Sequence, residues 1–233
     1  DIMLDRNVAA RSQRANAITY PFEKLPDDWF KQVDYAIANL EGPVTDTRRP
    51  PEKTIDFQFD PAFVPILKAQ GLDALSQANN HALDQGRMGY EDSVQRLREA
   101  GFLVFGDQVH DDEVALATTT IRGIRFAFVG FNTTDNPLDE AAASSTLAKA
   151  RTLADQVIVY MHWGLEYKDK APAFIVDQAH WLIDHGADIV TEALTKFVSG
   201  HSDVLMGSIT VRDESLIKPI RSLIGRMGIG VSP

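Results

Sequence analysis

The stretch "ALSQANNHALDQGRMGYEDSVQRLREAG", residues 74–101, decides the fold because it joins a predicted strand to a predicted helix. Its first part belongs to an apolar segment, residues 72–80, which predicts a buried strand. Its last part, residues 87–101, has apolar residues at helical spacing and closes with a glycine. Asn80 and His81 stand between the two, where the strand ends. The stretch therefore predicts a strand–helix unit with polar side chains at the carboxyl end of its strand.

Short apolar runs and longer helical stretches alternate along the remaining sequence. The pattern predicts strands over 33–41, 102–106 and 156–164, a hairpin over 118–132 that turns near Arg122-Gly123, and helices over 61–71, 145–155 and 171–186. Alternation of this kind is typical of an α/β domain with a largely covered sheet. The segment "TDTRRPPEKT", residues 45–54, predicts a surface loop near the site.

The composition is that of a globular protein and limits the function classes. The chain has 233 residues, 44% of them hydrophobic and 24% charged, which suits one large domain or two small ones. A net charge of −10 argues against nonspecific binding to nucleic acid or to an anionic membrane. No apolar run is long enough to predict a membrane span. Cysteine is absent, which excludes disulfides, thiolate metal ligands and a cysteine nucleophile.

The chain begins with Asp1 inside a predicted strand, and we interpret this as N-terminal trimming. No signal peptide is recognisable in the first residues. An anchor upstream would place the protein at the bacterial cell surface, and without one it would be cytoplasmic.

Four predicted strands carry at one end residues that can bind a metal ion or move a proton. These residues are Asp1, Asn39, Glu41, Asn80, His81 and His162. Ligand sites of α/β folds gather beyond the carboxyl ends of strands. Carboxylate, amide and imidazole groups together suit manganese, zinc or iron, and two such ions would activate water and neutralise phosphoryl charge. The alternatives are an Asn that caps a turn, a packed His before Trp163, and a solvated turn residue at Glu41.

Several motifs resemble those of the CapA-like proteins of poly-gamma-glutamate capsule synthesis, which belong to the calcineurin-like metallophosphoesterase superfamily. The motifs are "DIMLDRNV", "AIANLEGPVT", "ANNHALDQG", "VGFN" and "VIVYMHWGLEY…QAHWLIDHGADIV", in the family's order over residues 1–190. The resemblance implies an α/β fold: a metallophosphoesterase-like β-sandwich flanked by helices, with a dinuclear metal centre at strand ends and an atypical or incomplete C-terminal part.

The resemblance also implies a role for each matching residue. The metal ligands would be Asp1, Glu41, Asn80 and His162, with Asn39 beside them. His81 would contact the scissile group or act as general acid. Asp84 would orient His81 or its loop, or else cap the following helix. Glu166 and Tyr167 would line the cleft, and Tyr167 would also serve for packing.

The resemblance ends after Val190, where the family has a Gly-x-His-Pro-His turn that supplies its last metal ligands. This chain instead continues "TEALTKFVSGHSDVLMGSITVRDE", residues 191–214. That segment is similar to the PLP-dependent cystathionine lyases and synthases, in which Lys196 would form the Schiff base. His201 offers a substitute metal ligand, although the lyase resemblance explains its motif better. We predict a domain over 1–190 and a lyase-like segment over 191–233 that is not an independent domain.

A PLP enzyme also needs a stacked aromatic residue, an Asp on the pyridine nitrogen and an Arg for the substrate carboxylate. Residues 1–185 show no such match, so we expect no bound PLP and interpret the chain as a mosaic. An engineered fusion, a computed sequence and a natural recombination would each produce it.

Three functions follow from these observations. The first is a capsule-synthesis protein with an incomplete metal-dependent hydrolase site that acts on a phosphoester or an anionic polymer. The second is a noncatalytic module that binds an anionic polymer or a partner. The third is a fragment of a cystathionine lyase.

Overall fold

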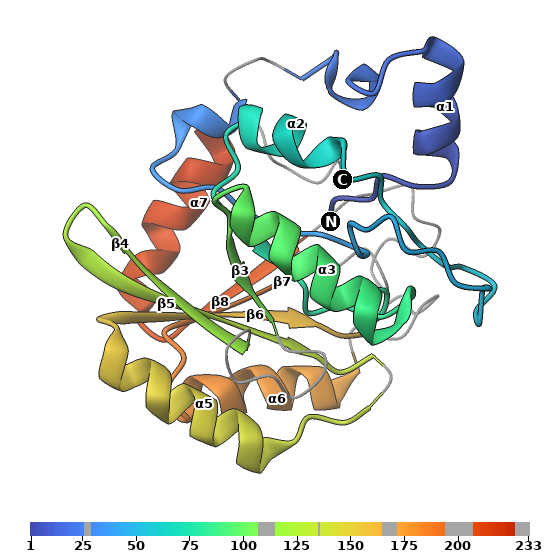
Figure 1. Cartoon of the computed structure of the whole chain (residues 1–233). Helices are drawn as coiled ribbons and strands as arrows, with labels where there is room; N and C mark the ends of the chain where they lie inside the picture. The colour runs from blue at the N-terminus through green and yellow to red at the C-terminus, as the bar shows by residue number, and fades with distance from the viewer. Residues whose placement is uncertain (26–28, 107–114, 135, 165–171, 194–206, 227–233) are drawn as a thin grey trace. The chain divides into compact units, whose positions relative to one another are not determined.

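The computed structural model describes residues 1–25, 29–106, 115–134, 136–164, 172–193 and 207–226. The chain forms two compact units, residues 1–117 and 118–233 (Figure 1). This division is different from the predicted boundary near residue 190. That boundary separates two segments that resemble different families, and it stays a prediction.

The first unit is built on a parallel three-stranded sheet in the order β1-β2-β3. The strands are β1 (Ile37–Asn39), β2 (Ala74–Ser76) and β3 (Leu103–Phe105). A parallel bridge between Ile2 and Leu40 brings the start of the chain alongside the end of β1. Because all of these segments run in one direction, their carboxyl ends meet at one edge of the sheet.

The strand predicted over 72–80 is shorter in the structure because its backbone leaves the sheet after Ser76. The Ala78 N–H donates to Ser76 Oγ at 3.1 Å, and the Asn79 N–H donates to the Gln77 carbonyl at 3.1 Å. Gly106 ends the neighbouring strand at φ +101°, and a Cβ there would lie 2.5 Å from the backbone N of Ala78. Glycine is therefore needed where the two segments pass each other.

Helices and an apolar core support this sheet. The helices are α1 (Asn7–Ala15), α2 (Phe63–Ala69) and α3 (Gly86–Glu99), with 3₁₀ turns Tyr20–Phe22 and Trp29–Gln32. The core includes Leu40, Phe59, Leu67, Leu75, Tyr90 and Leu97. The predicted helices over 61–71 and 87–101 are confirmed, whereas α1 was not predicted.

The second unit contains a five-stranded sheet in the order β4-β5-β6-β7-β8. Its strands are β4 (Leu116–Ile121), β5 (Ile124–Asn132), β6 (Gln156–His162), β7 (Ile189–Ala193) and β8 (Gly207–Val211). Strands β5, β6 and β7 are parallel, and β8 is antiparallel to β7. The predicted hairpin is confirmed, because Arg122 and Gly123 both adopt positive φ, as a tight two-residue turn requires.

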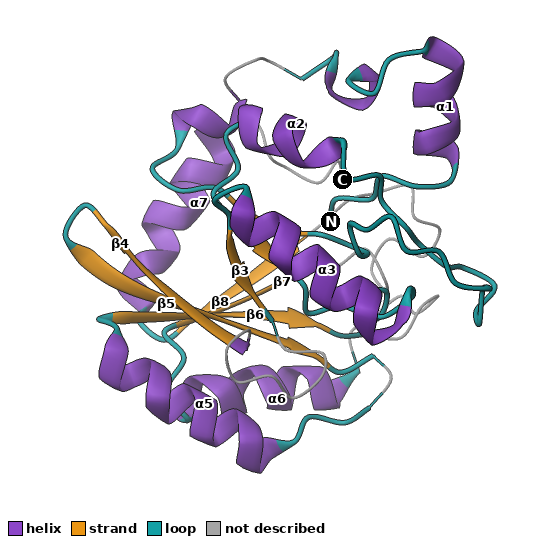
Figure 2. Cartoon of the chain, in the orientation of Figure 1, coloured by secondary structure: helices purple, strands orange, loops and turns teal. Residues whose placement is uncertain are grey.

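Helices α5 (Glu140–Leu153) and α6 (Ala173–Asp184) cover one face of this sheet, and Figure 2 shows them side by side. The Asp139 carboxylate caps α5 by accepting from the Ala142 N–H at 3.0 Å. A 3₁₀ turn (Glu214–Leu216) and α7 (Ile217–Arg226) follow β8. The predicted α/β class is confirmed. No helix in the described ranges is both long and apolar enough to cross a membrane.

Candidate functional site

Two carboxylates are held side by side at the carboxyl edge of the three-stranded sheet. The Asn39 Nδ2 group donates to Asp1 Oδ1 at 2.7 Å and to Glu41 Oε2 at 2.5 Å. Backbone bonds between Ile2 and residues 39 and 41 hold the two segments in register. Asn39 and Glu41 are buried, and Asp1 is exposed. The Asp1 and Glu41 carboxylates carry like charges at close range, and Glu41 is buried. This arrangement favours the binding of a cation beside them.

Asn79 connects this pair of carboxylates to the next strand. Its Nδ2 group donates to Asn39 Oδ1 at 3.0 Å and to the Leu40 carbonyl at 2.8 Å. Its Oδ1 accepts from the His81 N–H at 3.0 Å. Because Oδ1 of Asn39 accepts the bond from Asn79, the NH₂ group of Asn39 points toward the two carboxylates. This geometry favours a positioning role for Asn39.

The sequence predicts Asn80 as a metal ligand and does not single out Asn79, which makes the hydrogen bonds described above. Asn80 is half-buried, and its backbone carbonyl accepts a bond from Lys53 Nζ at 2.7 Å. Asn79 is 1% exposed. A fully buried amide must find several partners, but the burial of Asn79 is known only from the folded structure, so the sequence held no signal that distinguishes it from Asn80.

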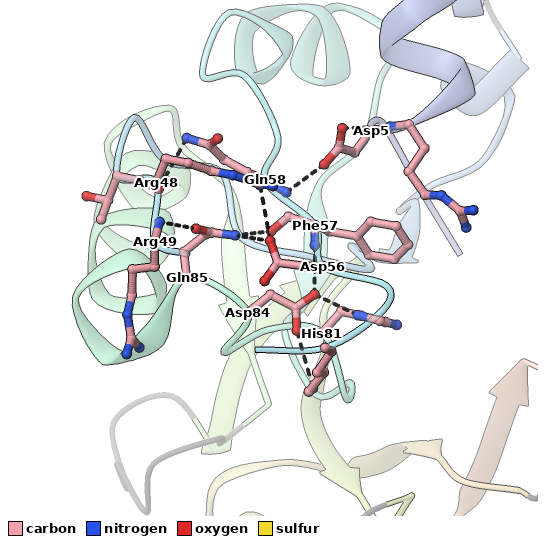
Figure 3. A network of polar contacts seen from close by, with 12 residues as sticks. Asp5, Arg48, Arg49, Asp56, Phe57, Gln58, His81, Asp84 and Gln85 are labelled. Atoms are coloured by element: carbon pink, nitrogen blue, oxygen red, sulfur yellow. Dashed lines mark hydrogen bonds and ion pairs between the residues drawn. The ribbon is translucent and has the colours of Figure 1, made fainter. Parts of the chain in front are cut away.

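His81 and Asp84 form a buried pair, shown in Figure 3. His81 Nδ1 lies 2.7 Å from Asp84 Oδ2, and that oxygen also accepts from the Phe57 N–H at 2.8 Å. The rings of His81 and Phe57 have centroids 4.3 Å apart. With Nδ1–H directed at the carboxylate, Nε2 is the nitrogen left for chemistry. Asp84 does not cap α3, whose N-cap residue is Gln85 and has no side-chain cap bond.

The predicted surface loop lies against this pair, and we name residues 46–58 the strap. Gln85, which is 0% exposed, accepts from the Arg49 N–H at 2.8 Å. It also donates to Asp56 Oδ1 at 2.8 Å and to the Phe57 carbonyl at 2.9 Å (Figure 3). Asp56 is paired with Arg48 at 3.1 Å. One buried side chain therefore fixes both ends of the strap.

The second unit holds His162 at the end of β6, where it pairs in register with Asn132 of β5. His162 is buried, and its Nδ1 lies 3.2 Å from the Tyr160 hydroxyl. Other predicted site residues fall outside the described residues, namely Glu166, Tyr167, Lys196 and His201. The ligand roles of His162 and His201 stay predictions.

Glu192, at the end of β7, is a partly buried carboxyl group in the same sheet. It accepts a hydrogen bond from the Ser208 hydroxyl of β8, and its second oxygen has no hydrogen-bond partner among the residues that the structure describes. Burial raises the pKa of Glu192, and the bond from Ser208 offsets part of that rise. Burial therefore shifts the protonation equilibrium of Glu192 toward the neutral form relative to an exposed glutamate.

The C-terminal segment is similar to PLP-dependent enzymes, as its sequence suggested. Residues 176–233 match the family described as Cys/Met metabolism PLP-dependent enzyme. Cystathionine beta-lyase MetC of Bacillus subtilis is 50% identical over 46 residues, which is 20% of this chain and 12% of that protein.

Most of the chain is similar to proteins of capsule synthesis. PGA biosynthesis protein CapA of Bacillus subtilis is 27% identical over 82% of this chain and 54% of its own length. Capsule biosynthesis protein CapA of Bacillus anthracis is 26% identical over 93% of this chain and 56% of its own length. The chain thus spans about half the length of these relatives. Residues 1–194 match the family described as Bacterial capsule synthesis protein PGA_cap, and the chain belongs to that family.

Proposed function

We propose that the chain is a metal-dependent hydrolase-like component of poly-gamma-glutamate capsule synthesis. The observation that supports this best is the hydrogen-bonded series from the Asp1 and Glu41 carboxylates through Asn39 and Asn79 to His81. This series connects two carboxylates that could bind a divalent cation to His81, which could transfer a proton. The names of the relatives provide the biological context.

The donor set fits manganese, zinc or iron. Asp1 and Glu41 offer carboxylate oxygens on neighbouring segments, and Asn80 was predicted to add its amide oxygen. His162 belongs to the second unit, and its ligand role stays a prediction. A bound divalent ion would supply Lewis-acid stabilisation and a nucleophilic water at neutral pH.

The remaining steps belong to the side chains of the first unit. Asn39 holds both carboxylates, so the ligand oxygens are ordered before the cation arrives. Asp84 fixes the ring of His81 through Nδ1. When His81 is protonated on both ring nitrogens, Nε2 would donate its proton to the leaving oxygen of a phosphoester or a related bond and leave the neutral ring with Nδ1–H bonded to Asp84.

The test measures manganese binding and p-nitrophenyl phosphate turnover in the purified chain, Glu41→Gln and His81→Asn, with Glu99→Gln as an exposed carboxylate control. We expect manganese to raise the melting temperature of the unsubstituted chain and the control, because a ligand that binds only the folded state stabilises it. Glu41→Gln should lose that rise, and His81→Asn should keep it but lose turnover. An equal rise in Glu41→Gln would contradict the proposed metal site.

A noncatalytic binding module is the second candidate, because the chain lacks the Gly-x-His-Pro-His turn after Val190. It predicts poly-gamma-glutamate binding without manganese stabilisation or turnover. We propose no PLP chemistry, since the lyase-like match covers only 12% of that relative.

A further inference from the structure

Lys53, at the tip of the strap, reaches back to the loop that carries His81. Its Nζ atom lies 2.7 Å from the Asn80 carbonyl and 3.3 Å from Asp84 Oδ1. The side chain of Asp84 is 0% exposed, whereas that of Lys53 is 48% exposed. The Lys53 side chain therefore contacts the loop of the buried pair while about half of its surface is exposed to solvent.

Among the lysines and arginines that the structure describes, Lys53 is the one whose charged group pairs with the Asp84 carboxylate. Asp84 accepts from the Phe57 N–H, from the His81 ring and from Lys53. A buried carboxylate needs such donors, since an unpaired buried charge is costly. Lys53 thus helps to hold the Asp84 side chain in place beside His81.

The ammonium group has more donors than these contacts use. It carries three N–H groups, and Asn80 and Asp84 account for two of them. No further acceptor for Lys53 is found among the residues that the structure describes. The other two cations of the strap have carboxylate partners within it, Arg48 with Asp56 and Arg49 with Glu52.

We propose that Lys53 is a specificity-determining residue that binds the oxyanion of the substrate beside His81 and positions Asp84. This inference rests on the proposed function for the location of the reacting bond. The oxyanion chemistry is shared by a phosphate ester and by the carboxylates of polyglutamate. Lys53 would provide a charge-assisted hydrogen bond for either one.

The experiment measures the affinity of the metal-free chain for inorganic phosphate and for N-acetylglutamate by calorimetry. The variants are Lys53→Met, Lys53→Arg and the matched control Arg49→Gln, which removes the same charge from the same strap. Melting temperatures establish that each variant folds. Turnover of p-nitrophenyl phosphate with manganese is measured in parallel.

We expect Lys53→Met to weaken binding of the preferred anion about tenfold, the size of one charge-assisted bond at a half-exposed site. Lys53→Arg should restore most of that affinity, because its guanidinium also donates to oxyanions, and Arg49→Gln should leave it unchanged. In turnover, Lys53→Met should raise KM more than it lowers kcat. The anion that loses more affinity identifies the substrate class.

Equal affinity in Lys53→Met and the unsubstituted chain, or an equal loss in Arg49→Gln, would overturn the role of Lys53. Absence of binding of both anions to the unsubstituted chain would overturn it as well. If anions bind through Lys53 but manganese gives no turnover, the proposed hydrolase function fails while the assignment of Lys53 stands.

Discussion

Replacing Gln85 with alanine should release the strap and destabilise the first unit. The amide of Gln85 is fully buried and makes three hydrogen bonds, to the Arg49 N–H, the Phe57 carbonyl and the Asp56 carboxylate. Each of the two neutral bonds contributes about 1 kcal/mol and the bond to the charged group about 1.5 to 3 kcal/mol, so we expect a loss of about 3.5 to 5 kcal/mol.

Urea unfolding of the purified chain measures this loss. Gln95→Ala, on the exposed face of the same helix, removes a surface bond to Glu99 and should change stability by less than about 0.5 kcal/mol. Hydrogen exchange provides a local readout, because the Arg49 amide loses its acceptor in Gln85→Ala. A loss below about 1 kcal/mol, with unchanged protection of the Arg49 amide, would refute the idea that Gln85 holds the strap.

Two further predictions concern other parts of the chain. Gly106→Ala should destabilise the fold by more than about 2 kcal/mol, because the added Cβ would meet the Ala78 backbone. Gly101 also has a positive φ but has open space around it, so Gly101→Ala should cost only about 1 kcal/mol. Equal losses of the two variants in urea unfolding would contradict this prediction. Glu192 has a raised pKa in the folded state, so its contribution to stability is greatest below its ordinary pKa of 4.5 and is lost as pH rises toward the raised value. Melting temperatures across this range should fall more steeply with pH in the unsubstituted chain than in Glu192→Gln, and parallel profiles would show that the pKa of Glu192 is not raised.

Much of the fold follows from local patterns in the sequence. Apolar runs of strand length and helical spacing predicted β1, β2, α2 and α3, because each of these elements buries a periodic apolar face. The turn at Arg122-Gly123 was found because glycine marks a tight reversal. Helix α1 was missed because its residues are mostly small or polar and Ser12 is the one buried residue among them.

The site was predicted only in part because its contacts connect distant segments. Asn39, Glu41 and His81 were identified because each follows an apolar run. Asn79 contacts Asn39, 40 residues away, and that contact depends on the register between β1 and β2. Lys53 reaches Asp84 across 31 residues of sequence. No periodic pattern specifies such pairs, and the burial of their polar groups is visible only after folding.

Because Gln85 holds the strap near both of its ends, the loop between these two contacts can be lengthened. Its ends are fixed by Gln85, a side chain from outside the loop, while residues 50–52 at its tip are exposed. For a flexible loop, each doubling of length costs only about 0.6 kcal/mol of closure entropy. Insertions between Pro50 and Pro51 should therefore be tolerated while both anchors remain, so this dipeptide is a suitable place for an epitope tag or a spectroscopic label close to the candidate site.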